Sequence, residues 1–226
     1  MACDEAMASP AKGKVLEGTE AEHKKMLKYK VLKPTHENDA REDDLAIGGA
    51  WAAKPKANGD ARCRQAARGL QQAAGKHYGP GGKPAPAASE MAIRIALALA
   101  AMASWLSCIA GAGGASLAGR LKNGERMLME APQGCQKHYP AYALLQLQRA
   151  LHGLAQAAMA FFREAAQALR YAGMHRDGAG PCLCFVWGKG KLSVILLWVD
   201  DMLIAGPKKK ALEIKEKLAK LLGCKG

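Results

Sequence analysis

The sequence predicts an α+β protein, because helix-like and strand-like segments both occur without the regular alternation of a parallel sheet. Apolar residues recur at helical spacing over Ala157–Tyr171 and again over Lys208–Leu222. Residues 192–199 are instead a continuous run rich in Val, Ile and Leu, which is typical of a buried strand. These three segments carry the prediction of the fold class.

The composition allows a folded core but limits how well that core is specified. A chain of 226 residues, 50% of them apolar, is long enough to bury one domain or somewhat more. Aromatic residues make up only 5% of the chain, so few large side chains are available. We therefore expect a loosely specified core.

Positive charge is concentrated after residue 50. Residues 1–50 hold 8 Lys or Arg against 10 Asp or Glu, whereas residues 51–226 hold 25 against 10, a net charge of +15. A segment this basic attracts polyanions, among which nucleic acid is the most common. A solvated basic surface without a ligand accounts for the charge equally well, so charge alone leaves both interpretations open.

The seven cysteines indicate an intracellular protein, cytoplasmic or nuclear. Their number is odd, no pair has Cys-x-x-Cys spacing, and Cys182-x-Cys184 lacks a second pair that would complete a zinc site. We therefore expect reduced thiols. The first 16 residues hold charged side chains around no apolar run, so we expect no signal peptide.

The first half of the chain is predicted to hold little regular structure. Residues 1–50 are polar and are expected to form a poorly ordered lead, with a short helix at 21–29. Residues 51–86 are basic and broken by glycines, which favours short strands and loops. Ser89 can cap a helix that runs to Trp105. A glycine cluster then interrupts regular structure at Gly111, Gly113 and Gly114.

The second half is predicted to be more regular. The leucines of residues 144–154 have a spacing that suits a helix, and the helix Ala157–Tyr171 is expected to end at Gly173. After the strand at 192–199, two acidic residues precede a second apolar run at 202–205. This order predicts a β-hairpin, followed by a basic amphipathic helix at Lys208–Leu222.

Asp200 and Asp201 are the most informative residues for function. They lie at the tip of the expected hairpin, beside apolar strands where an unpaired charge is costly. Two adjacent carboxylates repel each other, so their natural partner is a divalent cation. Enzymes that transfer nucleotidyl groups hold two Mg²⁺ ions with such acids. Taken alone, the pair also suits a turn that faces water, because Asp is a common turn residue.

Five sequence blocks resemble the reverse transcriptases of copia-type retrotransposons, in the family's order and at near-family separations. Residues 196–206 resemble the family's Tyr-Val-Asp-Asp hairpin, with Trp198 in the place of Tyr. Residues 147–157 are similar to its Leu-Tyr-Gly-Leu-Lys-Gln-Ala segment. The remaining three blocks lie at residues 86–105, 129–134 and 180–183. Together the resemblance covers roughly residues 51–222.

The resemblance implies a right-hand polymerase fold for residues 51–226. Fingers would span about 51–90 and the palm about 91–206, followed by the start of a C-terminal helix at 208–222. The thumb would be short or absent.

The resemblance also implies a site and its partners. Asp200 would be a metal ligand supported by Asp201, with two Mg²⁺ ions as cofactors. The implied activity is DNA synthesis on an RNA template, from a DNA primer and deoxynucleoside triphosphates. Gln156 would contact the template or the incoming nucleotide. Basic residues near the triphosphate are implied at Arg62, Arg64 and Arg68.

The main departure from the family lies at Gly111. The family has its first catalytic Asp six residues after the Trp that Trp105 resembles, and that count arrives at this glycine. No Asp or Glu occurs between Glu90 and Glu125 to replace it. Since a two-metal site needs carboxylates from separate strands, the sequence predicts a degenerate, catalytically impaired copy.

Two other interpretations stay open. The chain can be a catalytically silent, basic nucleic-acid-binding remnant of the same ancestry. It can instead be a small single-span membrane protein, because residues 95–119 carry no charge over a length that spans a bilayer. Their Ala, Gly and Ser content makes that segment only weakly lipophilic, so we expect no membrane partner.

Overall fold

The computed structural model shows a mixed α+β chain, which confirms the predicted fold class. It describes residues 12–41, 44, 46–79, 85–111, 117, 119–121, 126–132, 135–140, 143–178, 180–188 and 190–222. The chain forms two compact units. Unit 1 comprises Met1–Lys83 and Arg120–Ala157, and unit 2 comprises Pro84–Gly119 and Ala158–Gly226. Residues 120–157, which were expected in the palm, belong to unit 1, and the predicted boundaries of fingers and palm stay predictions.

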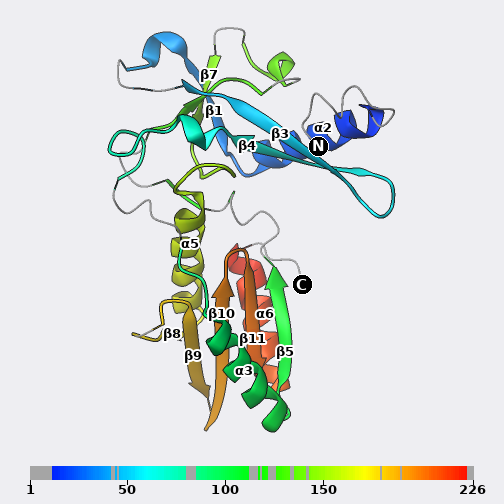
Figure 1. The fold of residues 1–226 in the computed structure, drawn as a ribbon, viewed down its shortest axis with the longest axis vertical. Coiled ribbons are helices and arrows are strands. Elements are labelled where there is room, and N and C mark those ends of the chain that lie inside the picture. The colour runs from blue at the N-terminus through cyan, green and yellow to red at the C-terminus, as the bar shows by residue number, and fades with distance from the viewer. Residues whose placement is uncertain are drawn as a thin grey trace. The chain divides into compact units, whose positions relative to one another are not determined.

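Unit 1 combines one long helix with two small sheets (Figure 1). The strands β1, β7, β6 and β2 form a four-stranded sheet in that order, and β3 pairs with β4 as a hairpin. Helix α2 packs against β4. The elements are α2 Lys12–Lys28, β1 Leu32–His36, η1 Glu37–Asp39, β2 Ala46–Ile47, β3 Gly49–Pro55, β4 Ala61–Ala67, η2 Gly69–Gln71, β6 Leu128–Met129, η3 Gln136–His138 and β7 Ala143–Leu147.

The N-terminal segment is more regular than the sequence indicated. We expected a poorly ordered lead with a helix at 21–29, whereas α2 spans 17 residues and β1 joins a sheet. Few of its side chains are apolar, but Val15, His23 and Met26 are buried and share one face of the helix. Three buried residues spread over 17 positions give only a weak helical pattern in a polar sequence, so the full length of α2 was not predicted. The first eleven residues of the expected lead lie outside the described residues.

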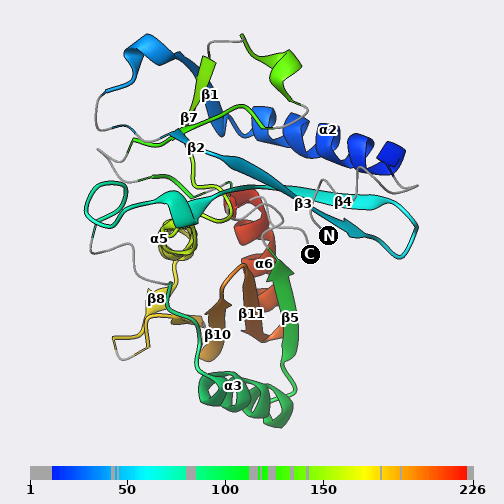
Figure 2. The ribbon, with the colours of Figure 1, turned by 45° about the horizontal axis from the view of Figure 1, so that its top comes forward.

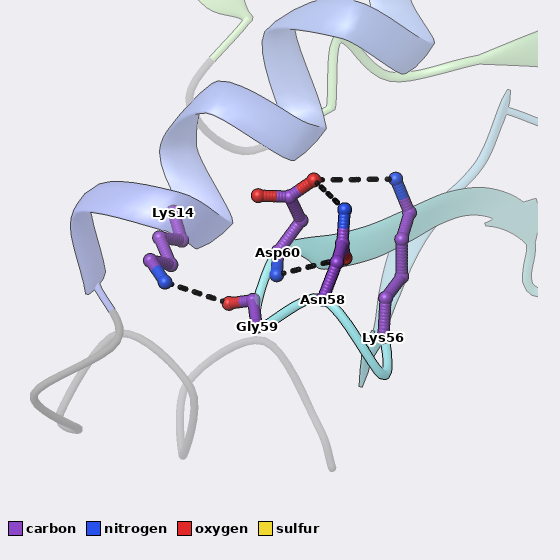
Figure 3. A network of polar contacts seen from close by, with 5 residues as sticks. All are labelled: Lys14, Lys56, Asn58, Gly59 and Asp60. Atoms are coloured by element: carbon purple, nitrogen blue, oxygen red, sulfur yellow. Dashed lines mark hydrogen bonds and ion pairs between the residues drawn. The ribbon is translucent and has the colours of Figure 1, made fainter.

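Two polar contacts fix α2 in unit 1. His23 is fully buried, and its Nε2 lies 3.2 Å from the Tyr139 hydroxyl. Burial raises the pKa of Tyr139 to about 12, so this hydroxyl stays protonated near neutral pH and shares a hydrogen bond with the ring nitrogen. At the start of the helix, Lys14 Nζ donates to the Gly59 carbonyl at 2.8 Å, at the tip of the β3–β4 hairpin (Figure 3).

The hairpin tip is a tight polar turn. Gly59 has a φ of +81°, a conformation that glycine adopts without strain. On either side of it, the Asn58 amide donates to the Asp60 carboxylate at 2.7 Å, and Lys56 lies 3.9 Å from the same carboxylate (Figure 3). These local contacts determine where β3 ends and β4 begins.

The helix predicted for residues 144–154 is wrong. Ala143–Leu147 is the strand β7, which pairs antiparallel with β1 and with β6. Leu145 and Leu147 are buried, and Leu144 and Gln146 are only partly buried. This alternation has the period of two that a strand requires, and the leucine spacing fitted both periods.

Unit 2 is an antiparallel sheet with helices on both faces. Its five strands lie in the order β5-β11-β10-β9-β8, and Figures 1 and 2 show α3 and α6 on opposite faces. The predicted helices at 157–171 and 208–222 and the predicted hairpin are confirmed. The elements are α3 Glu90–Met102, β5 Leu106–Gly111, α5 Ala157–Tyr171, β8 His175–Arg176, β9 Leu183–Gly188, β10 Lys191–Trp198, β11 Asp201–Gly206 and α6 Lys208–Leu222.

The core of unit 2 is built from aliphatic residues and many alanines. Phe161 is the one aromatic residue among the fully buried members of this cluster in the described part of the chain. Large buried side chains come from the central hairpin, with Ile195, Leu196 and Met202, and from α5, with Leu169. Many other buried members are alanines, and the expected loose specification of this core stays a prediction.

The uncharged segment at residues 95–119 does not form one continuous helix. Its described residues divide between α3 and β5, and Gly113 and Gly114 lie outside the described residues. Among the residues that the structure describes, no helix is long and apolar enough to cross a membrane.

Helices α2, α3 and α5 end with the same hydrogen-bond pattern, in which the second residue after the helix has a positive φ. At the end of α2, Val31 N donates to Met26 O and Lys30 N donates to Leu27 O, both at 3.0 Å. The left-handed residue is Gly173 after α5, but it is Lys30 after α2, with a φ of +51°. Glycine is the usual residue there, and another residue costs roughly 1–2 kcal/mol.

Replacing the N-cap of α3 will test the local design of unit 2. Ser89 Oγ accepts a hydrogen bond from the Ala92 amide at 3.1 Å, so Ser89→Ala leaves that amide without its acceptor. We expect a loss of about 1 kcal/mol in the free energy of unfolding, measured by urea denaturation. Ser107→Ala, on the exposed side of β5, is the matched control and should change stability little. Equal effects of the two substitutions would contradict the role of the cap.

Candidate metal-binding site

The β10–β11 hairpin brings the two predicted acids to its tip. Trp198 at the end of β10 pairs with Asp201 at the start of β11, so Val199 and Asp200 form a two-residue turn. Asp200 is partly buried and Asp201 is exposed. The turn is only two residues long, and the two strands pair continuously from Val194 opposite Ala205 to Trp198 opposite Asp201.

The turn holds a residue in an unfavourable backbone conformation. Val199 has a φ of +51°, which is rare for a β-branched side chain. Two-residue hairpins favour such a conformation because it matches the twist of the strands, but glycine normally supplies it. Strain of this kind is concentrated at functional sites in proteins. Trp198 and Val199 are about half-exposed beside the carboxylates, at 48% and 55%.

Gly111 lies directly beside Asp201. The pairing of β5 with β11 places these two residues opposite each other, and Asp201 in turn lies opposite Trp198. Residues that are opposite in an antiparallel ladder point to the same face, with Cβ atoms about 4.5–5.5 Å apart. The position identified by counting along the sequence is therefore the cross-strand neighbour of the second acid.

The donor set at this tip is incomplete for a two-metal site. Carboxylate oxygens suit Mg²⁺, but Asp200 and Asp201 supply only one side of such a site. Within the described residues, no group of three or more His, Cys, Asp or Glu side chains is placed to hold a metal ion. Gly111 offers no side chain at the position where a third carboxylate would face Asp201.

Gln156 is held by its own chain. Its side chain is only 2% exposed, Oε1 accepts from Gln72 Nε2 at 2.9 Å, and Nε2 donates to the His77 carbonyl at 3.4 Å. Gln72 Oε1 also accepts from the Ala155 amide at 2.8 Å. The amide of Gln156 thus braces the loop that follows β4, and its predicted contact with template or nucleotide remains a prediction.

The backbone next to Gln156 makes a close approach that only glycine allows. Gly153 has a φ of +89°, and a Cβ there would lie 2.1 Å from the Ala67 carbonyl oxygen. The Ala67 amide donates to the His152 carbonyl at 2.7 Å, so the end of β4 is tied directly to this segment. Gly153 and Gln156 therefore hold in place the end of β4 and the loop that follows it.

The predicted basic residues lie on the exposed side of the β3–β4 hairpin. Arg62 and Arg64 alternate with the buried Cys63 and Gln65, and Arg68 follows the strand as an exposed side chain. Lys54, which was not among the predicted site residues, lies directly opposite Arg62. Its signal was the alternation of exposed and buried side chains in β3.

Like charges directly opposite each other in a sheet destabilise it, which favours an anion on this face. The other face of the hairpin is covered by α2, because Trp51, Ala53 and Cys63 form a cluster with Val15. The predicted site residues thus divide between the two units. The three arginines and Gln156 belong to unit 1, and the two acids and Gly111 belong to unit 2.

Comparison with known proteins gives one result that identifies a family. A family model described as reverse transcriptase (RNA-dependent DNA polymerase) matches residues 37–225. The matched region includes both acids, Gly111 and the β3–β4 hairpin, whereas α2 and β1 precede it. No curated protein matches the chain at a significant level.

Replacing Val199 will test whether its positive φ lowers the stability of the protein. Val199→Gly should raise the free energy of unfolding by about 0.5–1 kcal/mol, because glycine adopts the positive φ freely and little burial is lost. The measurement is urea denaturation. Val186→Gly, the same change in the half-buried strand β9, should lower stability instead. A loss of stability in both variants would contradict the strain at Val199.

Proposed function

The chain belongs to the reverse transcriptase (RNA-dependent DNA polymerase) family, and we propose that it is a copia-type polymerase domain with an incomplete metal site. The observation that carries this proposal is the pairing of Gly111 with Asp201. The family match supplies the ancestral activity, and the missing carboxylate limits what this copy does. It binds nucleic acid and does not extend a primer at a useful rate.

The copia-type assignment is supported by the order of the sequence blocks. The hairpin block at residues 196–206, the block at 147–157 and the blocks at 86–105, 129–134 and 180–183 follow the sequence order of that group. Gln133 and Gly134 lie outside the described residues. In this proposal the antiparallel sheet of unit 2 is the palm, and the β3–β4 hairpin belongs to the fingers. Helix α6 begins the segment after the palm, with the thumb short or absent.

The chemistry of the acids explains why one lost carboxylate is decisive. In this family Mg²⁺ neutralises the charge that develops on the transferred phosphoryl group. Asp200 and Asp201 are the residues that would contact the ions from the β10–β11 side. With glycine on the β5 side, the set lacks a carboxylate that Mg²⁺ ions would need from that strand, so metal binding would be weak and nucleotide transfer would lose its support.

The basic face of β3 and β4 supplies the other half of the proposed function. Arg62 and Arg64 project from the exposed side of the hairpin beside Lys54, where a triphosphate or a nucleic-acid backbone offsets their mutual repulsion. Arg68 lies at the start of the loop that Gln156 braces. Gln156 is therefore proposed as a positioning residue for this surface, with RNA template, DNA primer and deoxynucleoside triphosphates as the partners.

A catalytically silent nucleic-acid-binding remnant is the alternative that a specific observation favours. The net charge of +15 on residues 51–226 attracts polyanions whether or not the metal site works. This alternative shares the ancestry and differs only in retaining no chemistry at all. Neither is expected to extend a primer detectably as the chain stands, so the Mn²⁺ titration of Gly111→Asp separates the two, because only an impaired metal site regains affinity.

Restoring the missing acid will test the proposed defect. The unmodified chain should give no detectable primer extension with Mg²⁺. In Gly111→Asp the new carboxylate lies beside Asp201, so without metal the two charges should lower stability. Added Mn²⁺ should reverse that loss, because the ion offsets the repulsion. Calorimetric Mn²⁺ titration and thermal unfolding with and without the ion measure both effects.

Two controls make this test specific. Asp200→Asn in the Gly111→Asp background should abolish the gain in Mn²⁺ affinity, whereas Gly188→Asp, on the exposed end of β9, should give none. If the unmodified chain extends a primer and Asp200→Asn stops it, the site is complete without an acid at position 111. The proposal of a broken site would then be wrong.

Nucleic-acid binding by the hairpin surface predicts a steep salt dependence. Affinity for single-stranded RNA, measured by fluorescence anisotropy, should fall with rising salt because phosphate contacts release counterions. Arg62→Gln with Arg64→Gln should weaken binding and reduce the salt slope by about 0.7 per lost contact. Lys208→Gln with Lys209→Gln removes the same charge from the exposed start of α6 and should change the slope less. Salt-independent binding would exclude the nucleic-acid assignment.

A further inference from the structure

A second basic site lies in unit 1, away from the β3–β4 hairpin face. The end of α2 and the start of β1 line a cavity of about 490 Å³ together with Arg120 and the residues that follow β7. The lining residues are Leu27, Lys30, Leu32, Lys33, Pro34, Arg120, Gln148 and Arg149. A cavity of this volume lies within the range of small-molecule binding sites in proteins.

The lining is strongly positive. Among the described residues that line the cavity, four are cationic and none carries a carboxylate. Arg120 and Arg149 are opposite each other in an isolated antiparallel bridge, so their side chains leave the same side of the backbone. The Gln148 amide donates to the Val31 carbonyl at 2.8 Å, which fixes the arginine segment against the end of α2. Such a concentration of cations around one cavity favours an anionic ligand.

Lys30 is present in this cavity at a conformational cost. It has a φ of +51° at the end of α2, where two backbone hydrogen bonds require a left-handed residue and glycine is usual. Glycine would satisfy the helix end better but would remove a cation from the lining. An unfavourable backbone conformation at a residue that lines a cavity is an indication of function.

The rest of the lining suits more than a bare anion. Leu27 is 46% exposed, and with Leu32 and Pro34 it gives the cavity an apolar side. Gln148 adds an exposed amide that can both donate and accept hydrogen bonds. Cations for a phosphate, an apolar surface for a sugar or base, and an amide for a base edge together match a nucleotide.

We propose that this cavity binds a phosphate-bearing nucleotide, with Lys30, Lys33, Arg120 and Arg149 around the phosphate. The nucleotide is either part of a nucleic-acid strand or a free nucleoside triphosphate, since both offer the same chemistry. Residues 27–34 precede the region that matches the family, whereas Arg120, Gln148 and Arg149 lie inside it, so the site joins the segment before the match to the matched region. The inference deepens the proposed nucleic-acid binding and uses none of the residues at the metal site.

The test compares two single-charge changes near the end of one helix. Lys30→Gly removes a lining cation and also supplies the favoured residue at the helix end. Lys24→Gln removes an exposed cation of α2 that does not line the cavity. Binding is measured with EDTA present, by anisotropy of a labelled oligothymidylate and by competition with deoxythymidine triphosphate. Thermal unfolding of each variant gives its stability.

We expect Lys30→Gly to raise the melting temperature while weakening oligothymidylate binding several-fold and reducing the salt slope by about 0.7. Lys33→Gln should weaken binding similarly, without the gain in stability. Lys24→Gln should leave affinity nearly unchanged. Effective competition by the triphosphate, lost in Lys30→Gly, would identify a free nucleotide as the ligand, and its absence would identify a strand.

Two outcomes overturn the inference and are distinguishable. If the chain binds the oligonucleotide but Lys30→Gly and Lys33→Gln behave like Lys24→Gln, the cavity is not a nucleotide site and the proposed function stands. If neither the unmodified protein nor any variant binds nucleic acid at low salt, both the cavity site and the proposed nucleic-acid partner are excluded.

Discussion

The pairing of β11 with both β5 and β10 is the constraint on which the candidate metal site depends. Side chains alternate between the two faces of a strand, so a slip by one residue would send every side chain to the opposite face. Ile195, Leu196 and Ile204 are buried in this sheet, which makes such a slip costly. The neighbours of Asp201 are therefore fixed by the core beneath them. Gly111 cannot be replaced by an acid from an adjacent position on β5 without disturbing that core.

The same ladder supports a tip that is unfavourable by itself. Val199 occupies a backbone conformation that β-branched residues avoid, and two adjacent carboxylates repel each other within two residues of it. Stability for this arrangement comes from the continuous apolar pairing below the tip and from α3 and α6 on the two faces. A core with few aromatics supplies it from many small contacts, among them Ala110 and Ala211. The unfavourable conformation and the charge repulsion are confined to the hairpin tip, whereas the stabilising apolar contacts extend over the whole of unit 2.

Segments with one strong periodic signal were predictable from sequence. The helices α5 and α6 lie where the pattern placed them because their apolar residues fit the helical period, and the β10–β11 hairpin lies where two short apolar runs flank an acidic pair. Strand β7 was not predictable in this way, since its leucines fit a helix locally and only pairing with β1 selects the strand. For the site, counting along the chain identified Gly111, but its position opposite Asp201 depends on a contact between residues 90 positions apart. Lys54 was not among the predicted site residues for the same reason, because its partner Arg62 lies on the other strand of the hairpin.

Helix α2 has a consequence for where the folded domain begins. The family match starts at residue 37, but Val15 of α2 is buried against Trp51 and Cys63 inside the matched region. Lys14 also holds the tip of the β3–β4 hairpin, well beyond the first matched residue (Figure 3). A fragment cut at the family boundary would therefore expose an apolar sheet face that belongs to the interior, and exposed strands of this kind associate with one another. The folded region therefore extends N-terminally beyond the family match, and α2 covers an apolar face of the β3–β4 hairpin that the match alone leaves open to water.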